Sequence, residues 1–260
     1  MESMRDLTYP PTIWTAKALF RVLGMKFQMS GTEHIPRQGG AILAANHISY
    51  VDFIFDGLAA QPSRRLVRFM AKKDAFEHPI SGPLMRSYHH ISVDRENGEQ
   101  SYRDGVEYAR NGQIVGIFPE ATISRSFEIK ELKTGAVRMA AEAGVPLIPM
   151  VTWGTQLLKT KDHAPDLLGR GKTIALHVGA PLDVTGQDPV RETERLRAAM
   201  SALLDQAIAQ YPVPPEGQWW APARHGGTAP TPEEARRLDA EEMTARAAKR
   251  AARESGDAGA

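Results

Sequence analysis

The most informative feature of this 260-residue chain is what it lacks, beginning with cysteine. Without cysteine the chain forms no disulfide, no thiolate zinc site, no iron–sulfur cluster and no cysteine nucleophile. It also lacks an excess of one charge, because 32 Lys and Arg face 31 Asp and Glu, and so no general nucleic-acid surface is indicated. We therefore expect a cytoplasmic protein in which any site for an anion is local.

Long hydrophobic runs are missing as well. No apolar run reaches the roughly 20 residues that a helix needs to cross a bilayer, and the amino terminus has no signal-peptide pattern. What is present, 42% hydrophobic and 24% charged residues, is typical of a globular protein with one sizeable core. This balance predicts an enzyme or a binding protein of the cell interior.

Between residues 31 and 211, short apolar runs alternate with longer mixed segments. The runs predict buried strands at 41–45, 66–71, 113–118, 146–153 and 173–178. The mixed segments predict helices at 52–60, 98–110, 133–143 and 189–210. Such alternation is typical of a single α/β domain, whose largely parallel or mixed sheet is covered by helices on both faces.

The two ends of the chain differ from this domain. Within residues 1–30, the segment 9–29 predicts an amphipathic helix, which either lies in a membrane interface or covers the core. Residues 212–230 form a linker rich in Pro, Gly and Trp. Residues 231–260 are rich in Ala, Arg and Glu and begin with a capping box at Thr231, which predicts a solvated helix or a partly disordered tail.

The sharpest local feature is the segment Asn46–Asp52, which follows a predicted buried strand. Five helical residues would turn His47 about 140° away from Asp52, so His47 must precede the helix that Asp52 begins. The carboxylate can then accept a hydrogen bond from one imidazole nitrogen and leave the other nitrogen as a base. Taken alone, the pair fits a structural role as well as a catalytic one.

A second polar segment, Phe118–Ser126, also opens at the end of a predicted strand. It carries an acid, several hydroxyls and an Arg. With Ile91–Arg95 and Val145–Met150, these segments resemble, in order, the motifs of the glycerolipid acyltransferase family typified by 1-acylglycerol-3-phosphate acyltransferases. The family patterns are Asn-His-four residues-Asp, Gly-two residues-Phe-Ile-Asp-Arg, Phe-Pro-Glu-Gly-Thr-Arg-Ser and Val-Pro-Ile-Ile-Pro-Val.

This resemblance implies direct transfer of an acyl group from a thioester, acyl-CoA or acyl carrier protein, to a hydroxyl of lysophosphatidate or glycerol 3-phosphate. It implies no cofactor, no metal, no nucleic-acid partner and no acyl-enzyme. By carry-over, His47 is the general base, Asp52 orients it, and Arg95 and Glu120 bind the glycerol phosphate. The location implied is the cytoplasmic side of the plasma membrane, with the protein peripheral or monotopic.

The chain departs from the family pattern at several positions. His89 and Ala121 stand where the family has Gly. Ile123 stands at the Arg position, so either a two-residue insertion gives Arg125 that role or another residue supplies the cation. Thr122 is a further candidate for binding the phosphate, and so is Lys73, which lies just after the carboxyl end of the predicted strand 66–71. Two alternative functions remain: a thioesterase or hydrolase, and a lipid-binding scaffold that has kept the fold.

Overall fold

The computed structural model describes residues 6–79, 81–94 and 98–257. Its centre is a seven-stranded sheet with the strand order β1-β7-β6-β2-β5-β3-β4. The strands are β1 (Lys26–Ser30), β2 (Ala41–Ala45), β3 (Val67–Lys72), β4 (Ile91–Val93), β5 (Ile114–Ile117), β6 (Leu147–Trp153) and β7 (Thr173–Val178). All five predicted strands are present, each within two residues of its predicted bounds.

The sheet is mixed, and its direction changes at one place. Strands β6, β2, β5, β3 and β4 run parallel to one another, whereas β7 is antiparallel to β6 and parallel to β1. The predicted α/β class with a largely parallel or mixed sheet is confirmed. Because the central strands share a direction, the loops that follow β2, β5, β3 and β6 meet at one edge of the sheet.

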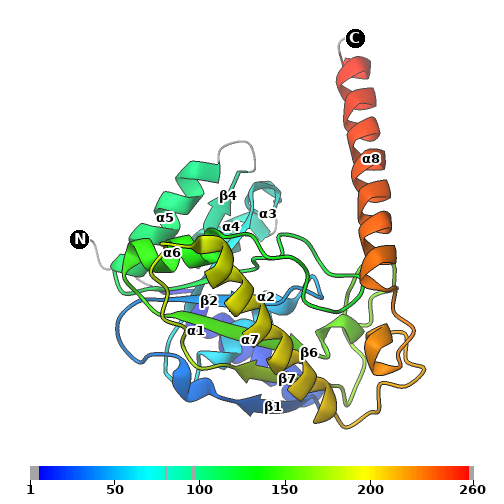
Figure 1. Ribbon diagram of the computed structural model, residues 1–260, viewed down its shortest axis with the longest axis horizontal. Coiled ribbons are helices and arrows are strands. Elements are labelled where there is room, and N and C mark those ends of the chain that lie inside the picture. The colour runs from blue at the N-terminus through cyan, green and yellow to red at the C-terminus, as the bar shows by residue number, and fades with distance from the viewer. Residues whose placement is uncertain (1–5, 80, 95–97, 258–260) are drawn as a thin grey trace.

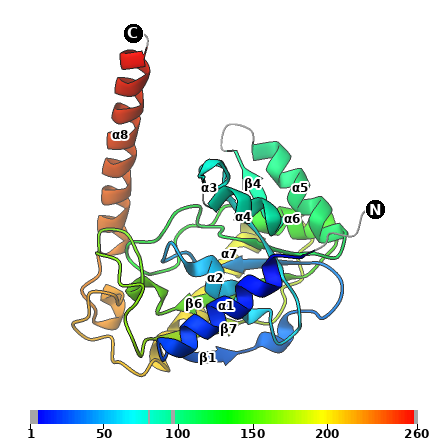
Figure 2. The same ribbon diagram turned by 180° about the vertical axis from the view of Figure 1, so that it is seen from behind.

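Helices cover both faces of the sheet. They are α1 (Tyr9–Val22), α2 (Asp52–Ala59), α3 (Lys73–Glu77), α4 (Ser81–Ser87), α5 (Gly98–Arg110), α6 (Gly135–Ala143), α7 (Pro189–Ala209) and α8 (Pro232–Asp257), with short 3₁₀ turns at Thr32–His34, Thr155–Leu157 and Ala223–His225. Side chains of α5, α6 and α7 form one buried cluster with the sheet, and those of α1 and α2 form the other. Figures 1 and 2 show α7 and α1 on opposite sides.

The amino-terminal segment is a shorter helix than the sequence predicts. Helix α1 ends at Val22, and Gly24 follows with φ +65°, a left-handed conformation that stops a helix. Residues 26–30 then form β1 at the edge of the sheet, paired with β7. The predicted helix over 9–29 is therefore wrong beyond residue 22, because pairing with β7 satisfies the backbone of this segment.

Helix α1 covers the core and also presents apolar side chains to solvent. Tyr9 and Phe20 are buried, whereas Trp14 is 77% exposed and Val22 is 65% exposed. No helix among the described residues is long and apolar enough to cross a membrane.

The segment after α7 is packed against the domain. Trp220 is buried and lies edge-on to Trp153 and Tyr211, and its carbonyl oxygen accepts a hydrogen bond from Gln156. Helix α8 begins with the predicted capping box, in which Thr231 and Glu234 exchange hydrogen bonds. Its first turns lie against the loops of the domain, and the rest projects away from it in both views (Figures 1 and 2).

Candidate active site

His47 lies in the turn between β2 and α2, two residues after a strand whose residues are all buried. Its Nδ1 atom is 3.0 Å from Oδ2 of Asp52, and Asp52 is the first residue of α2. The imidazole is partly exposed, with 22% of its side chain accessible, and it stacks on Phe118 at a centroid distance of 4.3 Å. The geometry expected from the spacing of these two residues is therefore present.

Asp52 is fully buried and accepts four hydrogen bonds. Besides the imidazole, the backbone N–H groups of Ile48 and Ser49 donate to its Oδ2 at 2.8 Å, and the Thr155 hydroxyl donates to Oδ1 at 2.5 Å. Because every partner is a donor, this arrangement suits an ionised carboxylate. A carboxylate in this position can hold a proton on Nδ1 of His47, which would leave the lone pair on Nε2.

The carboxylate of Glu120 accepts hydrogen bonds from the backbone of this turn and of a neighbouring loop. Its Oε1 accepts the N–H of His47 at 2.9 Å and its Oε2 accepts the N–H of Lys130 at 3.2 Å. Burial raises the pKa of Glu120 to about 8, although the two backbone hydrogen bonds oppose the rise. The Glu120 side chain is 5% exposed, and its hydrogen bond to the His47 N–H fixes the backbone at His47. That Glu120 binds a glycerol hydroxyl stays a prediction.

Sequence reasoning missed the support that β6 gives to this site. Asn46 donates to the carbonyl oxygen of Thr152 and accepts the Thr152 N–H in return, at 3.0 and 2.7 Å. The Thr152 hydroxyl donates to Asp56, whose pKa is raised well above its usual range by burial and by repulsion from Asp52. Thr152 and Thr155 lie at the carboxyl end of a predicted strand, which is the signal that could have found them.

Arg125 and Thr122 lie on the loop after β5. They are part of a cluster of polar and charged side chains that also includes residues of the loop after β6 and of α8. The guanidinium of Arg125 bonds Asp162, Asp239 and Glu242, and its side chain is 8% exposed. Lys130 donates from Nζ to the Thr122 hydroxyl at 2.7 Å. Ser124, next to Arg125, donates its N–H to the carbonyl oxygen of His47 at 2.7 Å. The cluster is therefore tied to the backbone of the candidate base.

Lys73, another of the predicted phosphate ligands, lies at the same edge of the sheet. Lys73 is the first residue of α3, directly after β3, and its Nζ is 3.1 Å from a carboxylate oxygen of Asp94. Arg95 lies outside the described residues. The roles of Lys73 and Arg95 stay predictions.

The two positions where the resemblance expected Gly share one backbone feature. Both His89 and Ala121 have positive φ angles, +53° and +60°. These are left-handed conformations that Gly adopts more easily than other residues. The chain has therefore kept the backbone conformation that a Gly permits while changing the residue.

His90 makes a structural contact. Its Nδ1 accepts the N–H of Phe69 at 3.1 Å, and burial lowers the pKa of the imidazole to about 4. Among the residues that the structure describes, no group of three or more His, Asp or Glu is arranged to hold a metal ion.

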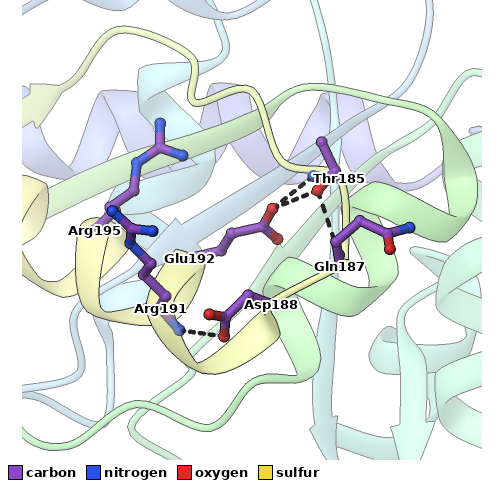
Figure 3. A pocket seen from close by; sticks show the side chains of 6 residues that line it. All are labelled: Thr185, Gln187, Asp188, Arg191, Glu192 and Arg195. Carbon is purple, nitrogen blue, oxygen red and sulfur yellow. Dashed lines mark hydrogen bonds between the residues drawn. The ribbon is translucent and has the colours of Figure 1, made fainter.

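A depression at the start of α7 does not belong to this site. Figure 3 shows that Glu192 points to Thr185 and Asp188 to the backbone of Arg191. Glu192 accepts hydrogen bonds from Thr185 and Gly186, which makes it a cap for this loop. The loop follows Leu182, which pairs with Leu147 at the amino end of β6, the opposite edge of the sheet from His47.

Comparison with known proteins identifies relatives of this chain. The family model described as Acyltransferase matches residues 26–153. The 1-acyl-sn-glycerol-3-phosphate acyltransferase of Bacillus subtilis (strain 168) is 33% identical over 198 residues, which are 75% of this chain and 94% of that protein. The enzyme of the same name from Salmonella typhimurium (strain LT2) is 30% identical, over 73% of this chain and 75% of that protein.

One solved structure extends the likeness to the fold. The 1-acyl-sn-glycerophosphate acyltransferase PlsC from Thermotoga maritima has a TM-score of 0.60 and 22% sequence identity. The match covers 76% of this chain and 78% of that chain. At this identity, the comparison shows the fold alone.

Proposed function

The chain belongs to the acyltransferase family, and from this premise we propose that it transfers an acyl group from acyl-CoA to the free hydroxyl of 1-acylglycerol 3-phosphate. The names of the similar curated enzymes support this acceptor. The observation that carries the proposal is the bond between His47 and the buried Asp52, beside a loop that bears a cation cluster. The product would be a phosphatidate, a precursor of phospholipids.

In the proposed mechanism, Nε2 of His47 takes the proton of the acceptor hydroxyl as its oxygen attacks the thioester carbonyl carbon. The carbon–sulfur bond then breaks, and the departing thiolate takes the proton back from the imidazolium. Asp52 stabilises the positive charge that His47 carries in between, because its carboxylate is 3.0 Å from Nδ1. No acyl-enzyme forms, and the reaction uses no cofactor apart from the acyl thioester.

Cationic side chains would hold the phosphate of the acceptor. We assign its phosphate to Arg125 and Lys130, with Lys73 as a further cation at the same edge of the sheet. Arg95 is a further candidate on the resemblance alone. A guanidinium matches phosphate oxygens through its planar fork of donors. Thr122 lies within this group, because its hydroxyl accepts a hydrogen bond from Lys130.

The lipid nature of the substrates requires contact with a membrane, and we assign this contact to the exposed face of α1. Trp14 and Val22 lie on this face together with the exposed cations Lys17 and Arg21. Apolar side chains flanked by cations suit a surface of anionic lipid. We place this contact on the cytoplasmic side of the plasma membrane.

Product analysis tests the reaction. Purified protein incubated with acyl-CoA and 1-acylglycerol 3-phosphate should yield phosphatidate, and His47→Ala should yield none while keeping the thermal stability of the wild type. Fatty acid released at the same rate with and without acceptor would instead indicate a thioesterase. Binding of the acceptor without any product would indicate a scaffold.

Vesicle sedimentation tests the membrane contact. Val22→Ser should reduce recovery of the full-length protein with anionic vesicles. Val190→Ser is the matched control, because Val190 is 63% exposed on α7, over the opposite face of the sheet. Equal recovery of the two variants would remove α1 from the contact.

A further inference from the structure

The cation cluster beside the candidate base is occupied by two carboxylates of α8. Lys130 is 2.7 Å from Asp239, and Lys161 is 3.0 Å from both Asp239 and Glu242. Arg125 bonds both of these acids through its two terminal nitrogens. Asp239 and Glu242 are three residues apart and therefore lie on one face of the helix.

These ion pairs are shielded from solvent. The side chains of Arg125 and Lys161 are 8% and 11% exposed, and those of Asp239 and Glu242 are 18% and 24% exposed. Cations buried to this degree need anionic partners. If α8 moved away, another anion would therefore be favoured in its place.

The cluster is connected to His47 through the carboxylate of Glu120. The N–H of Lys130 and the N–H of His47 donate to the two oxygens of the same carboxylate, that of Glu120. An anion bound by Lys130 would therefore lie on the loop that orients the candidate base.

Few of the side chains of α8 that the structure describes are buried, and Leu238 is half-buried. Ala235 is buried in its first turn, but the large apolar side chain of Met243 is 70% exposed. Figures 1 and 2 show that the remainder of α8 projects beyond the domain. Its charged contacts therefore contribute to holding the helix at this place, and another anion would compete for the same cations.

We propose that α8 is an internal competitor: Asp239 and Glu242 occupy the cations Arg125, Lys130 and Lys161, and a phosphate monoester displaces them when it binds. The two carboxylates carry the same charge as a phosphate dianion, so the exchange leaves the charge of the cluster unchanged. This inference rests on the proposed function in taking the acceptor's phosphate as the natural competitor. The docked helix would thus keep the site closed to weakly binding anions.

Hydrogen exchange on the full-length wild type is the first test, with glycerol 3-phosphate as the probe. Amides of α8 around residues 239–243 should exchange several-fold faster with the probe than with glycerol, or with sodium chloride at matched ionic strength. Unchanged exchange at saturating probe, or failure of the probe to bind, would overturn the proposal.

The second test removes the competing charges. If α8 is docked about nine-tenths of the time, the double variant Asp239→Asn with Glu242→Gln should bind glycerol 3-phosphate about tenfold more tightly than the wild type. Glu233→Gln with Glu241→Gln is the matched control: it removes two charges from the same helix, and Glu241 pairs with Arg237 of that helix. Equal or weaker binding by a folded double variant would contradict the proposal, and the exchange result decides the matter if that variant does not fold.

The two tests separate this inference from the proposed function. Binding and exchange require no acyl transfer, so displacement of α8 by the probe without any phosphatidate product would reject only the proposed function. Phosphatidate formation with an α8 that does not respond to the probe would reject only the competitor.

Discussion

Replacing Asp52 with Asn tests the proposed mechanism most directly, because it removes one charge and retains the shape of the side chain. The Asn oxygen can still accept the N–H groups of Ile48 and Ser49, and its NH₂ group can donate to the Thr155 hydroxyl, which rotates to accept. The fold should therefore survive the substitution with a loss of about 1–2 kcal/mol in the free energy of unfolding.

The effect on catalysis should be much larger. A carboxylate 3.0 Å from Nδ1 of His47 stabilises the imidazolium by about 5 kcal/mol at an effective dielectric constant of about 20. That charge exists only after His47 has taken the proton, so the interaction lowers the barrier rather than favouring bound substrate. Since the Asn dipole supplies part of the stabilisation, kcat should fall about 10²–10⁴-fold.

Steady-state kinetics with acyl-CoA and 1-acylglycerol 3-phosphate measure this effect, and thermal unfolding checks the fold. KM for both substrates should stay near the wild-type values, because in the proposed mechanism the charge that Asp52 stabilises arises only after the substrates have bound. Asp183→Asn is the matched control, since Asp183 is exposed near the opposite edge of the sheet and should leave kcat unchanged. A kcat for Asp52→Asn within threefold of the wild type would refute the assignment of Asp52.

Three further predictions concern the residues around this pair. Thr155→Val should lower kcat about tenfold by removing the hydrogen bond to Asp52, whereas Thr155→Ser should restore it; equal kinetics of the two variants would contradict this. Ala121→Gly should raise the free energy of unfolding by about 0.5–1 kcal/mol in urea titrations, because Ala121 has φ +60°, and a decrease would show that this conformation carries no strain. Relative to Glu120→Gln, the wild type should lose free energy of unfolding as the pH rises from about 5 to 8. The reason is that the unfolded chain releases the Glu120 proton in this range, while the folded chain keeps it because its pKa is raised. Parallel pH profiles of the two proteins would argue against the raised pKa.

The contact between His47 and Asp52 could be predicted because its evidence is local in the sequence. Only five positions separate His47 from Asp52, and the preceding apolar run fixes where the strand ends. The partners that hold the pair in place are distant: Thr155 is 103 positions from Asp52, and Glu120 is 73 positions from His47. A strand-end rule indicates which loops meet at one edge of the sheet, but the contacts within that edge depend on the order of the strands.

The amino-terminal segment shows a different limit. Periodicity alone favours a helix from Tyr9 to Met29, because large apolar residues recur past Val22 up to Met29. Gly24 was a visible stop signal, yet β1 forms only because β7 offers a free edge. A strand at the edge of a sheet gains its hydrogen bonds from a partner almost 150 residues away, and no local pattern records that partner.

Helix α8 shows how a balanced composition can conceal a specific contact. Its acids and bases are equal in number up to Ser255, which is the usual pattern of a solvated surface helix. Two of those acids nevertheless face cations from the loops after β5 and β6, up to 117 positions away. No motif distinguishes Lys130 and Lys161 from surface lysines. Only the fold brings these two lysines together with Asp239 and Glu242. The near-zero net charge of the chain therefore includes cations neutralised at the site itself, which is why charge totals say little about where an anion binds.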